Sequence, residues 1–460
     1  MKKFFTITVT LLIASSAFAQ EQEAKKGPEF TYGARAWLYG VTGQQKDLAY
    51  DYSHFRIRPM FSLGMEDIKL VTHLEISQTF GRDTSSGGAG AGYAGPATDN
   101  YSIKIKGAYL EAKNVIIPNL TLMGGLNGYK YPFVVDNDFG MFTAGYDFGM
   151  GKANLSYIKL NEYELYEKKS DGTKQNKDAQ AYALDVPIKV DKDITVRPGL
   201  IYIQGGKNHN SDPAAILSIA LPNEVRSLYK TSLVNAALNV TGKVDMISFT
   251  ATGAYLTGTL YKMLNTAVSP VVEGDDVKTS AYAFDLGVDA KPNDMFKIGA
   301  FVTYATGNDN KKADENNNYF RNMEGIFGRP DKADGAGYGR LFIFEAASVV
   351  QVGGNYDQFF AMEHPQGYMS YGVNAEAKID KVTIFAQFGI AQTAEKDGNG
   401  KTSLGSEIDA KISYALASKT ALFAEFGYVL AGDIQFNKQS ANAAKVENMY
   451  QVAFGMTSQI

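Results

Sequence analysis

Apolar and polar side chains alternate along the stretch His54-Phe55-Arg56-Ile57-Arg58-Pro59-Met60-Phe61-Ser62-Leu63. Successive side chains of a β-strand point to opposite faces, so this period of two gives the strand one apolar face and one mostly polar face. Similar alternation, interrupted by turns, recurs about eighteen times after residue 30. Strands with one oily and one wet face suit a closed barrel that has lipid outside and water inside. The sequence therefore predicts an all-β fold, a transmembrane antiparallel up-and-down β-barrel of about 18 strands.

The same period fixes the faces of later strands. In residues 247–255 we place Phe249 on the lipid side near mid-membrane, and in residues 296–304 we place Phe301 in the lumen. Short turns such as 243–245 alternate with long, polar, Gly-rich segments at 81–100, 161–178, 205–226 and 307–366. In bacterial barrels the short turns are periplasmic and the long loops extracellular, so we expect an even number of strands with both ends in the periplasm.

The N-terminus has the features of a cleavable signal peptide. Lys2 and Lys3 precede an apolar run over residues 4–14, and Ala17-Phe18-Ala19 forms a small-residue cleavage site. No apolar run long enough for a membrane-spanning helix follows, and the mean hydropathy is -0.20. We predict a signal peptide over residues 1–19, a short periplasmic segment over 20–29, and a bacterial outer-membrane barrel over 30–460.

Composition excludes several classes of protein. The chain has no cysteine, which excludes disulfides, thiolate nucleophiles, Cys-ligated zinc and covalently attached c-type haem. A net charge of -4 indicates no nucleic-acid binding. The 28 Tyr and 27 Phe, against one Trp, are enough to form the aromatic girdles that membrane barrels place at both interfaces.

The polar faces of the predicted strands sort the lumen charges into two groups. The basic group comprises Arg35, Arg56, Arg58, Lys69, Lys104, Lys106 and Arg197, and the acidic group comprises Asp285, Asp289, Glu376, Glu407, Asp409 and Glu425. Opposed rows of charge in a narrow aqueous pore create a transverse field that orients water and favours dipolar solutes. The alternative interpretation is that these groups pair with one another and fill the lumen.

Several stretches resemble a known group of barrels. Tyr304-Ala305-Thr306-Gly307-Asn308-Asp309-Asn310, together with Tyr32-Gly33-Ala34-Arg35, Arg56-x-Arg58-Pro59 and Ala108-Tyr109-Leu110, resembles the eighteen-stranded alginate-export and related porin-like barrels. The resemblance implies a pore, and for alginate exporters an arginine-rich one. Only Arg35, Arg56, Arg58 and Arg197 could play that part here, and the acidic group argues against polyuronate as the solute.

Two segments are candidates for narrowing the pore. The stretch from Gly124 to Phe133 resembles porin segments that lead into a loop folded back into the lumen, although an ordinary extracellular loop is the alternative. The largest loop, 307–366, contains an apolar run from Leu341 to Val350 with Glu345 inside it. Loops of this length are usually functional or mobile, and this one is expected to plug the lumen, extend the wall as a lid, or pack on the rim.

The sequence shows no recognisable catalytic or metal-binding pattern. The four histidines are His54, His73, His209 and His364, and no Gly-x-Ser-x-Gly elbow accompanies them. The stretch 397–401 lacks the ligand order of a calcium loop. We predict no enzyme activity, no cofactor and no metal site.

The function predicted from these features is that of an outer-membrane porin, a passive diffusion channel for small hydrophilic solutes or ions. Its expected partners are the lipid bilayer and those solutes, without nucleic acid, and a homotrimer is a possible assembly. The alternatives are an exporter of an anionic polysaccharide and a plugged barrel acting as a surface adhesin.

Overall fold

The computed structural model describes residues 27–45, 48–82, 102–131, 133–161, 179–205, 231–265, 272–308, 340–345, 366–396, 399–434 and 448–459. The predicted signal peptide and residues 20–26 lie outside these ranges, as do most of the long loops. Among the described residues, no helix is both long and apolar enough to span a bilayer.

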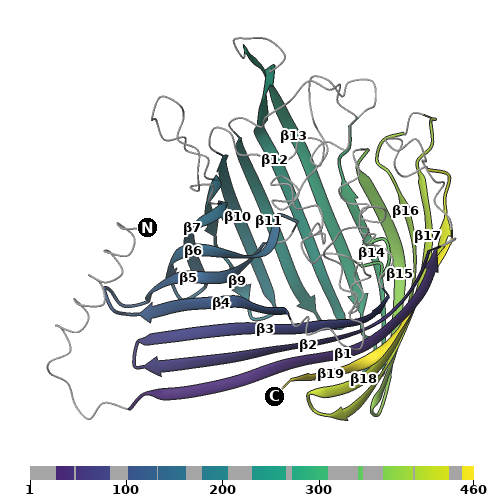
Figure 1. Ribbon diagram of the computed structural model, residues 1–460, viewed down its shortest axis with the longest axis horizontal. Coiled ribbons are helices and arrows are strands. Elements are labelled where there is room, and N and C mark those ends of the chain that lie inside the picture. The colour runs from purple at the N-terminus through teal and green to yellow at the C-terminus, as the bar shows by residue number, and fades with distance from the viewer. Residues whose placement is uncertain are drawn as a thin grey trace.

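The described residues form one closed antiparallel sheet (Figure 1). Its strands are β1 (Glu29–Gln45), β2 (Leu48–Met65), β3 (Ile68–Arg82), β4 (Ser102–Lys113), β5 (Leu120–Tyr131), β6 (Val135–Asp147), β7 (Lys152–Asn161), β8 (Ala179–Asp185), β9 (Ile188–Asp191), β10 (Ile194–Gly205), β11 (Ser232–Val244), β12 (Ile247–Asn265), β13 (Val272–Ala290), β14 (Phe296–Ala305), β15 (Tyr368–Ile379), β16 (Val382–Gln392), β17 (Ser403–Ala417), β18 (Thr420–Ala431) and β19 (Met449–Gln459). Each strand except β8 pairs with the next in sequence, and β19 pairs with β1 to close the barrel.

The strands β8 and β9 share one position in the barrel. Both pair with β10, and the break between them falls at Val186 and Pro187. Proline has no N–H to give to a β-ladder, which explains an interruption at this point. Counting β8 and β9 as one, the barrel has eighteen strand positions. The predicted fold class and strand number are confirmed.

The two ends of the barrel differ. At one end, here called the turn end, the connections are short. In three of them the first residue, Glu66, Asp245 or Asp380, has a φ of 49°, 52° or 51°, the left-handed conformation of tight turns. The other end, here called the loop end, carries the long loops. The predicted alternation of short and long connections is not strict, because the connection after Tyr131 at the loop end is also short.

The predicted faces agree with the exposure of the side chains. On β14 the outward Phe296 and Ile298 are 48% and 57% exposed, whereas the inward Phe301 and Thr303 are 5% and 0% exposed. Toward the loop end, tyrosines of neighbouring strands meet on the outer surface, and the rings of Tyr157 and Tyr182 lie 5.6 Å apart. Such a row is typical of the aromatic girdles of membrane barrels.

Candidate functional site in the barrel lumen

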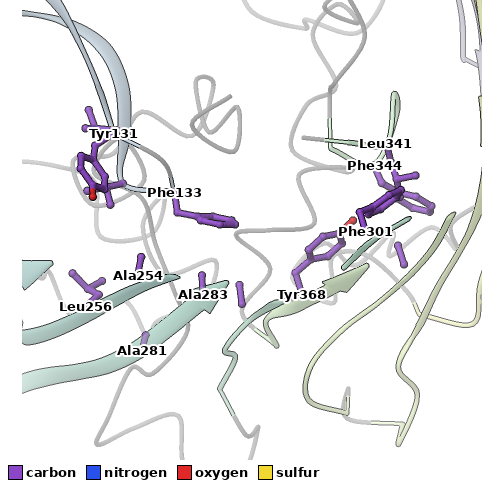
Figure 2. Packing of buried hydrophobic residues seen from close by; sticks show 14 of the residues in the cluster. Tyr131, Phe133, Ala254, Leu256, Ala281, Ala283, Phe301, Leu341, Phe344 and Tyr368 are labelled. Carbon is purple, nitrogen blue, oxygen red and sulfur yellow. The ribbon is translucent and has the colours of Figure 1, made fainter. Parts of the chain in front are cut away.

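Two segments of chain enter the barrel. One is the β5–β6 hairpin tip around Tyr131 and Phe133, and the other is residues 340–345 from the connection between β14 and β15. Figure 2 shows Tyr131 and Phe133 of the hairpin tip on one side, above Ala254 and Ala283 of the barrel wall, and Leu341 and Phe344 of the other segment on the opposite side. The site is therefore an interior bounded by the wall and by two inserted pieces.

The hairpin tip is held by β10 and β11 of the barrel wall. Tyr131 is 1% exposed, and its hydroxyl donates to the carbonyl oxygens of Arg197 on β10 at 2.6 Å and of Ala237 on β11 at 3.2 Å. A Cβ atom at Gly199 would lie 2.4 Å from the Tyr131 ring, so a side chain there would collide with it. The stretch that resembles a pore-narrowing loop thus folds back into the barrel.

Arg197 contacts this hairpin and links it to Asp185 of β8. Its Nε and Nη2 donate to the two carboxylate oxygens of Asp185 at 2.7 and 2.8 Å, and Nη2 also donates to the Lys130 carbonyl oxygen at 2.9 Å. Its guanidinium carbon lies 4.7 Å from the centre of the Tyr131 ring. A bidentate pair of this kind orients the guanidinium rigidly. Arg197 faces inward, and its Nε and Nη2 donors are occupied by Asp185 and the hairpin.

Residues 340–345, here called the inserted segment, begin with an arginine bound to β13. Nε and Nη2 of Arg340 donate to the two oxygens of Asp285 at 2.8 and 2.5 Å, and the Thr303 hydroxyl donates to Asp285 at 2.9 Å. The guanidinium carbon lies 5.5 Å from the centre of the Phe301 ring. A Cβ at Gly287 would lie 2.3 Å from Nη2, so the absence of a side chain there makes room for the guanidinium.

The backbone of the inserted segment binds two carboxylates of β17. Glu407 accepts hydrogen bonds from the amides of Ile343 and Phe344 at 2.5 and 2.8 Å. Asp409 accepts one from the amide of Phe342 at 3.2 Å and one from Gln387 Nε2 at 2.6 Å. Successive amides of a turn that point the same way form a favourable site for a carboxylate, as at the first turn of a helix.

Glu345 closes the inserted segment on itself and on β15. Its carboxylate accepts hydrogen bonds from the amides of Arg340 and Leu341 and from the hydroxyls of Tyr368 and Ser370, at 2.5 to 3.3 Å. Burial raises the pKa of the Glu345 carboxyl, and these donors act in the opposite direction. Glu345 was noted in the sequence, and the structure gives it the role of fixing this turn.

The inward acidic residues fall into two classes of exposure. Asp285, Glu407, Asp409 and Glu425 are 1%, 0%, 0% and 3% exposed, whereas Asp289 and Glu376 are partly exposed. Lys411 donates to Glu425 at 2.6 Å. The sequence-based picture of an open acidic wall therefore needs correction, because four of its six members are covered or paired. The strand of Glu425, β18, also does not lie across the barrel from β1, since β19 alone separates the two.

The inward basic residues of β1 and β2 are close together. Arg35 and Arg58 face each other across the β1–β2 pair, and the guanidinium of Arg58 lies 5.4 Å from the Trp37 ring. Arg58 Nη2 lies 2.6 Å from Glu75 Oε2, and Arg56 Nε lies 3.8 Å from the same atom. Two arginines thus share one carboxylate, while Arg35 is exposed.

The predicted lysines lie on β3 and β4. Lys69 and Lys104 are exposed, and Lys106 forms an ion pair with Asp138 of β6. The structure brings Arg35, Arg56 and Arg58 together on adjacent strands, and leaves Arg197 with the hairpin tip. Within the described ranges, no group of three or more His, Asp or Glu side chains is arranged to hold a metal ion.

Sequence reasoning missed Arg340, Gln387 and Asp185. Their partners come from other strands or loops, and Arg340 is 55 residues from Asp285. One signal was available, because Arg340 directly precedes an apolar run inside a polar, Gly-rich loop. Such a run needs a place away from water, and the barrel interior provides it.

Solved structures with the same fold exist. The chain is similar to Pseudomonas aeruginosa OccK8 (OprE), with 11% identity and a TM-score of 0.54 over 94% of this chain and 98% of that one. It is also similar to Acinetobacter baumannii OccAB2, with 10% identity, a TM-score of 0.53 and coverage of 94% and 98%. The chain is also similar to the outer membrane protein opdK from Pseudomonas aeruginosa, with 9% identity and a TM-score of 0.53 over 94% of this chain and 98% of that one.

These similarities concern the fold. No protein-family model matches the sequence, and no curated protein matches it either. The structural similarity supports a porin-like barrel and does not single out the alginate-export group. The chain therefore has the eighteen-stranded fold of the porin-like β-barrels.

Proposed function

We propose that this protein is a passive diffusion channel of the bacterial outer membrane for small hydrophilic solutes or ions, with a preference for anions. The observation that carries the proposal is the charge left exposed inside the barrel. Arg35, Lys69 and Lys104 are exposed on the inward face of β1 to β4, whereas most of the inward carboxylates are covered or paired. The signal peptide over residues 1–19, a periplasmic turn end and assembly as a homotrimer belong to the same proposal.

The fold similarity to an outer membrane protein supports the proposed location in the outer membrane. Export of an anionic polysaccharide has weaker support. Arg197 is bound by Asp185, and Arg56 and Arg58 share Glu75, so few arginines remain for a polyuronate. A plugged adhesin differs from a channel in conductance, which makes that measurement decisive.

Single-channel recording of the purified protein in planar bilayers tests the proposal. We expect discrete conductance steps, and in a KCl gradient a reversal potential on the chloride side. Recordings without steps, from protein shown to be folded by heat-modifiable mobility on gels, would overturn the proposal. Chemical cross-linking of the detergent-solubilised protein shows whether it assembles as a trimer.

The basic residues provide the matched variants. Arg35→Gln removes an exposed charge and leaves the Arg58–Glu75 pair intact, so it is expected to move the reversal potential toward that of potassium without loss of folding. Replacing Arg35, Arg56 and Arg58 together by Gln also leaves Glu75 without its partners, which adds to the shift. Lys192→Gln is the control, because Lys192 is 85% exposed in a turn at the turn end. An unchanged potential in the triple variant contradicts a role of this cluster in selectivity.

A further inference from the structure

We infer that the inserted segment, residues 340–345, determines the ion selectivity of the barrel by covering the carboxylates of β13 and β17 and placing a guanidinium over them. This inference rests on the proposed channel function. It concerns a different part of the lumen from the basic cluster of β1 and β2. The inserted segment would reconcile the inward acidic residues with a preference for anions.

The barrel wall beneath the inserted segment is acidic. Asp285, Glu407 and Asp409 all belong to barrel strands and point inward, and the lumen would be acidic here if water reached them. In the structure each is at most 1% exposed. Ions in the lumen therefore cannot approach these carboxylate oxygens directly.

The inserted segment compensates the carboxylates that it covers. A buried carboxylate needs hydrogen-bond donors or a paired cation to offset its lost hydration. Three amides of the segment donate to Glu407 and Asp409, and the guanidinium of Arg340 donates twice to Asp285. The side chain of Arg340 is 25% exposed, against 1% for Asp285. The surface that the segment presents to the lumen is thus basic where the wall below is acidic.

The barrel wall has glycines at the positions where the apolar side chains of the inserted segment pack. A Cβ at Gly389 on β16 would lie 2.5 Å from Leu341 Cδ2, and one at Gly427 on β18 would lie 3.0 Å from Ile343 Cδ1. The two glycines leave room for the two apolar side chains, which are 0% and 4% exposed. Four strands contribute to this seat. Strands β13 and β17 supply the carboxylates, β16 supplies Gln387 and Gly389, and β18 supplies Gly427. A specific seat of this kind favours a built-in part of the lumen over a loop resting there by chance.

The test compares selectivity with and without the cover. In the first variant Arg340 becomes Ala and residues 341–344 become Gly-Ser-Gly-Ser, which keeps the loop length. The lumen then gains three carboxylates and loses one guanidinium, so the reversal potential in a KCl gradient is expected to cross from the chloride side to the potassium side. A second variant adds Asp285→Asn, Glu407→Gln and Asp409→Asn, and is expected to return toward the original selectivity because the uncovered charges are gone.

Two further variants keep the test decisive. Arg340→Gln alone removes the exposed cation and is expected to shift the potential in the same direction by a smaller amount, even if the larger replacement fails to fold. The pair Leu341→Cys and Gly389→Cys tests the seat, because Leu341 Cγ lies 3.4 Å from a Cβ built at residue 389, close to disulfide geometry. The chain has no other cysteine. We expect this disulfide to form in the membrane-inserted protein, because the segment then occupies its seat.

The outcomes separate the two proposals. Wild-type protein without conductance steps overturns the channel function. Wild-type steps with unchanged selectivity in both Arg340→Gln and the segment replacement overturn the present inference and leave the channel standing. Failure of the cysteine pair to oxidise also overturns it, because the segment would then not occupy the seat. A potassium-side shift that the added neutral substitutions do not reverse attributes the effect to pore width, which contradicts the role of the carboxylates.

Discussion

Arginine at an outward position of β11 gives a direct measure of how deep that position lies in the membrane. Leu238 is 47% exposed on the outer face and lies six residues before Val244, the last residue of β11 at the turn end. Strands rise about 3.3 Å per residue and tilt by about 40° in such barrels, so each residue spans about 2.5 Å of depth. Leu238 then lies about 15 Å from the turn end, close to the middle of an apolar band about 25 Å tall.

Depth sets the expected cost. Arginine facing lipid at the midplane costs about 2 to 4 kcal/mol, and near an interface about 0 to 1 kcal/mol. Leu238→Arg is therefore expected to show the full penalty. Phe249 was placed near mid-membrane from sequence, but it is the third residue of β12, about 5 Å from the turn end. The structure moves Phe249→Arg to the small end of the range.

The assay is urea unfolding of the barrel in lipid vesicles, followed by heat-modifiable mobility. Thr250→Arg is the matched control, because Thr250 neighbours Phe249 in depth and lies on the inward face. We expect the loss of unfolding free energy to decrease from Leu238→Arg to Phe249→Arg, with Thr250→Arg close to wild type. A larger loss at Thr250 than at Leu238 would refute the assignment of faces, since a register error of one residue exchanges them.

Further variants test the interior. Tyr131→Phe removes a hydroxyl that donates to two carbonyl oxygens, and we expect a loss of about 1 kcal/mol in unfolding free energy and noisier open-channel current. Lys411→Met leaves Glu425, 3% exposed, without its cation, so urea unfolding should show about 1 to 3 kcal/mol of destabilisation, and adding Glu425→Leu should recover much of it. Phe301→Arg should retain the barrel, as its inward position predicts, and raise the chloride preference because it adds a second cation beside Arg340; an unchanged reversal potential would contradict that placement.

The barrel could be predicted because its signal is local. Alternation with a period of two is present within each strand, and it assigned Phe296 to the outer face and Thr303 to the lumen without knowledge of any partner strand. The even strand number followed from the connections. The break at Pro187 was also visible in the sequence, since proline interrupts a β-ladder, but periodicity alone did not show that β8 and β9 share one strand position.

The environment of the inward side chains could not be predicted in the same way. Periodicity tells which face a residue occupies, whereas exposure depends on what lies above that face. Glu407 and Glu376 both alternate correctly into the lumen, yet Glu407 is 0% exposed beneath the inserted segment and Glu376 remains partly exposed. The difference arises from contacts such as Ile343 with Glu407, which join residues 64 positions apart. No local pattern encodes a contact of that range.

Strand register shows which residues lie beside each inward side chain, which periodicity alone does not show. Arg35 lies opposite Arg58 on β2 and opposite Gln459 on β19, so neither directly facing residue offers a carboxylate. Arg197 has Asp185 within reach on the neighbouring β8 and is held by it in a bidentate pair. Two inward arginines therefore have different roles: Arg35 is exposed to ions in the lumen, whereas Arg197 holds the hairpin tip.

Strand register alone does not predict the ion pairs, because several neighbouring cations compete for the same carboxylate. Lys104 lies opposite Glu75 across the β3–β4 pair, yet the Glu75 oxygen accepts from Arg58 at 2.7 Å. An arginine donates to a carboxylate through a rigid planar fork, whereas a lysine ammonium is a flexible point charge, which favours Arg58 as the partner. Lys104 is left exposed to the lumen as a consequence. Around Glu75 the cations thus outnumber the carboxylate, because Glu75 is shared by two arginines and faces a third cation, Lys104, that it does not bind.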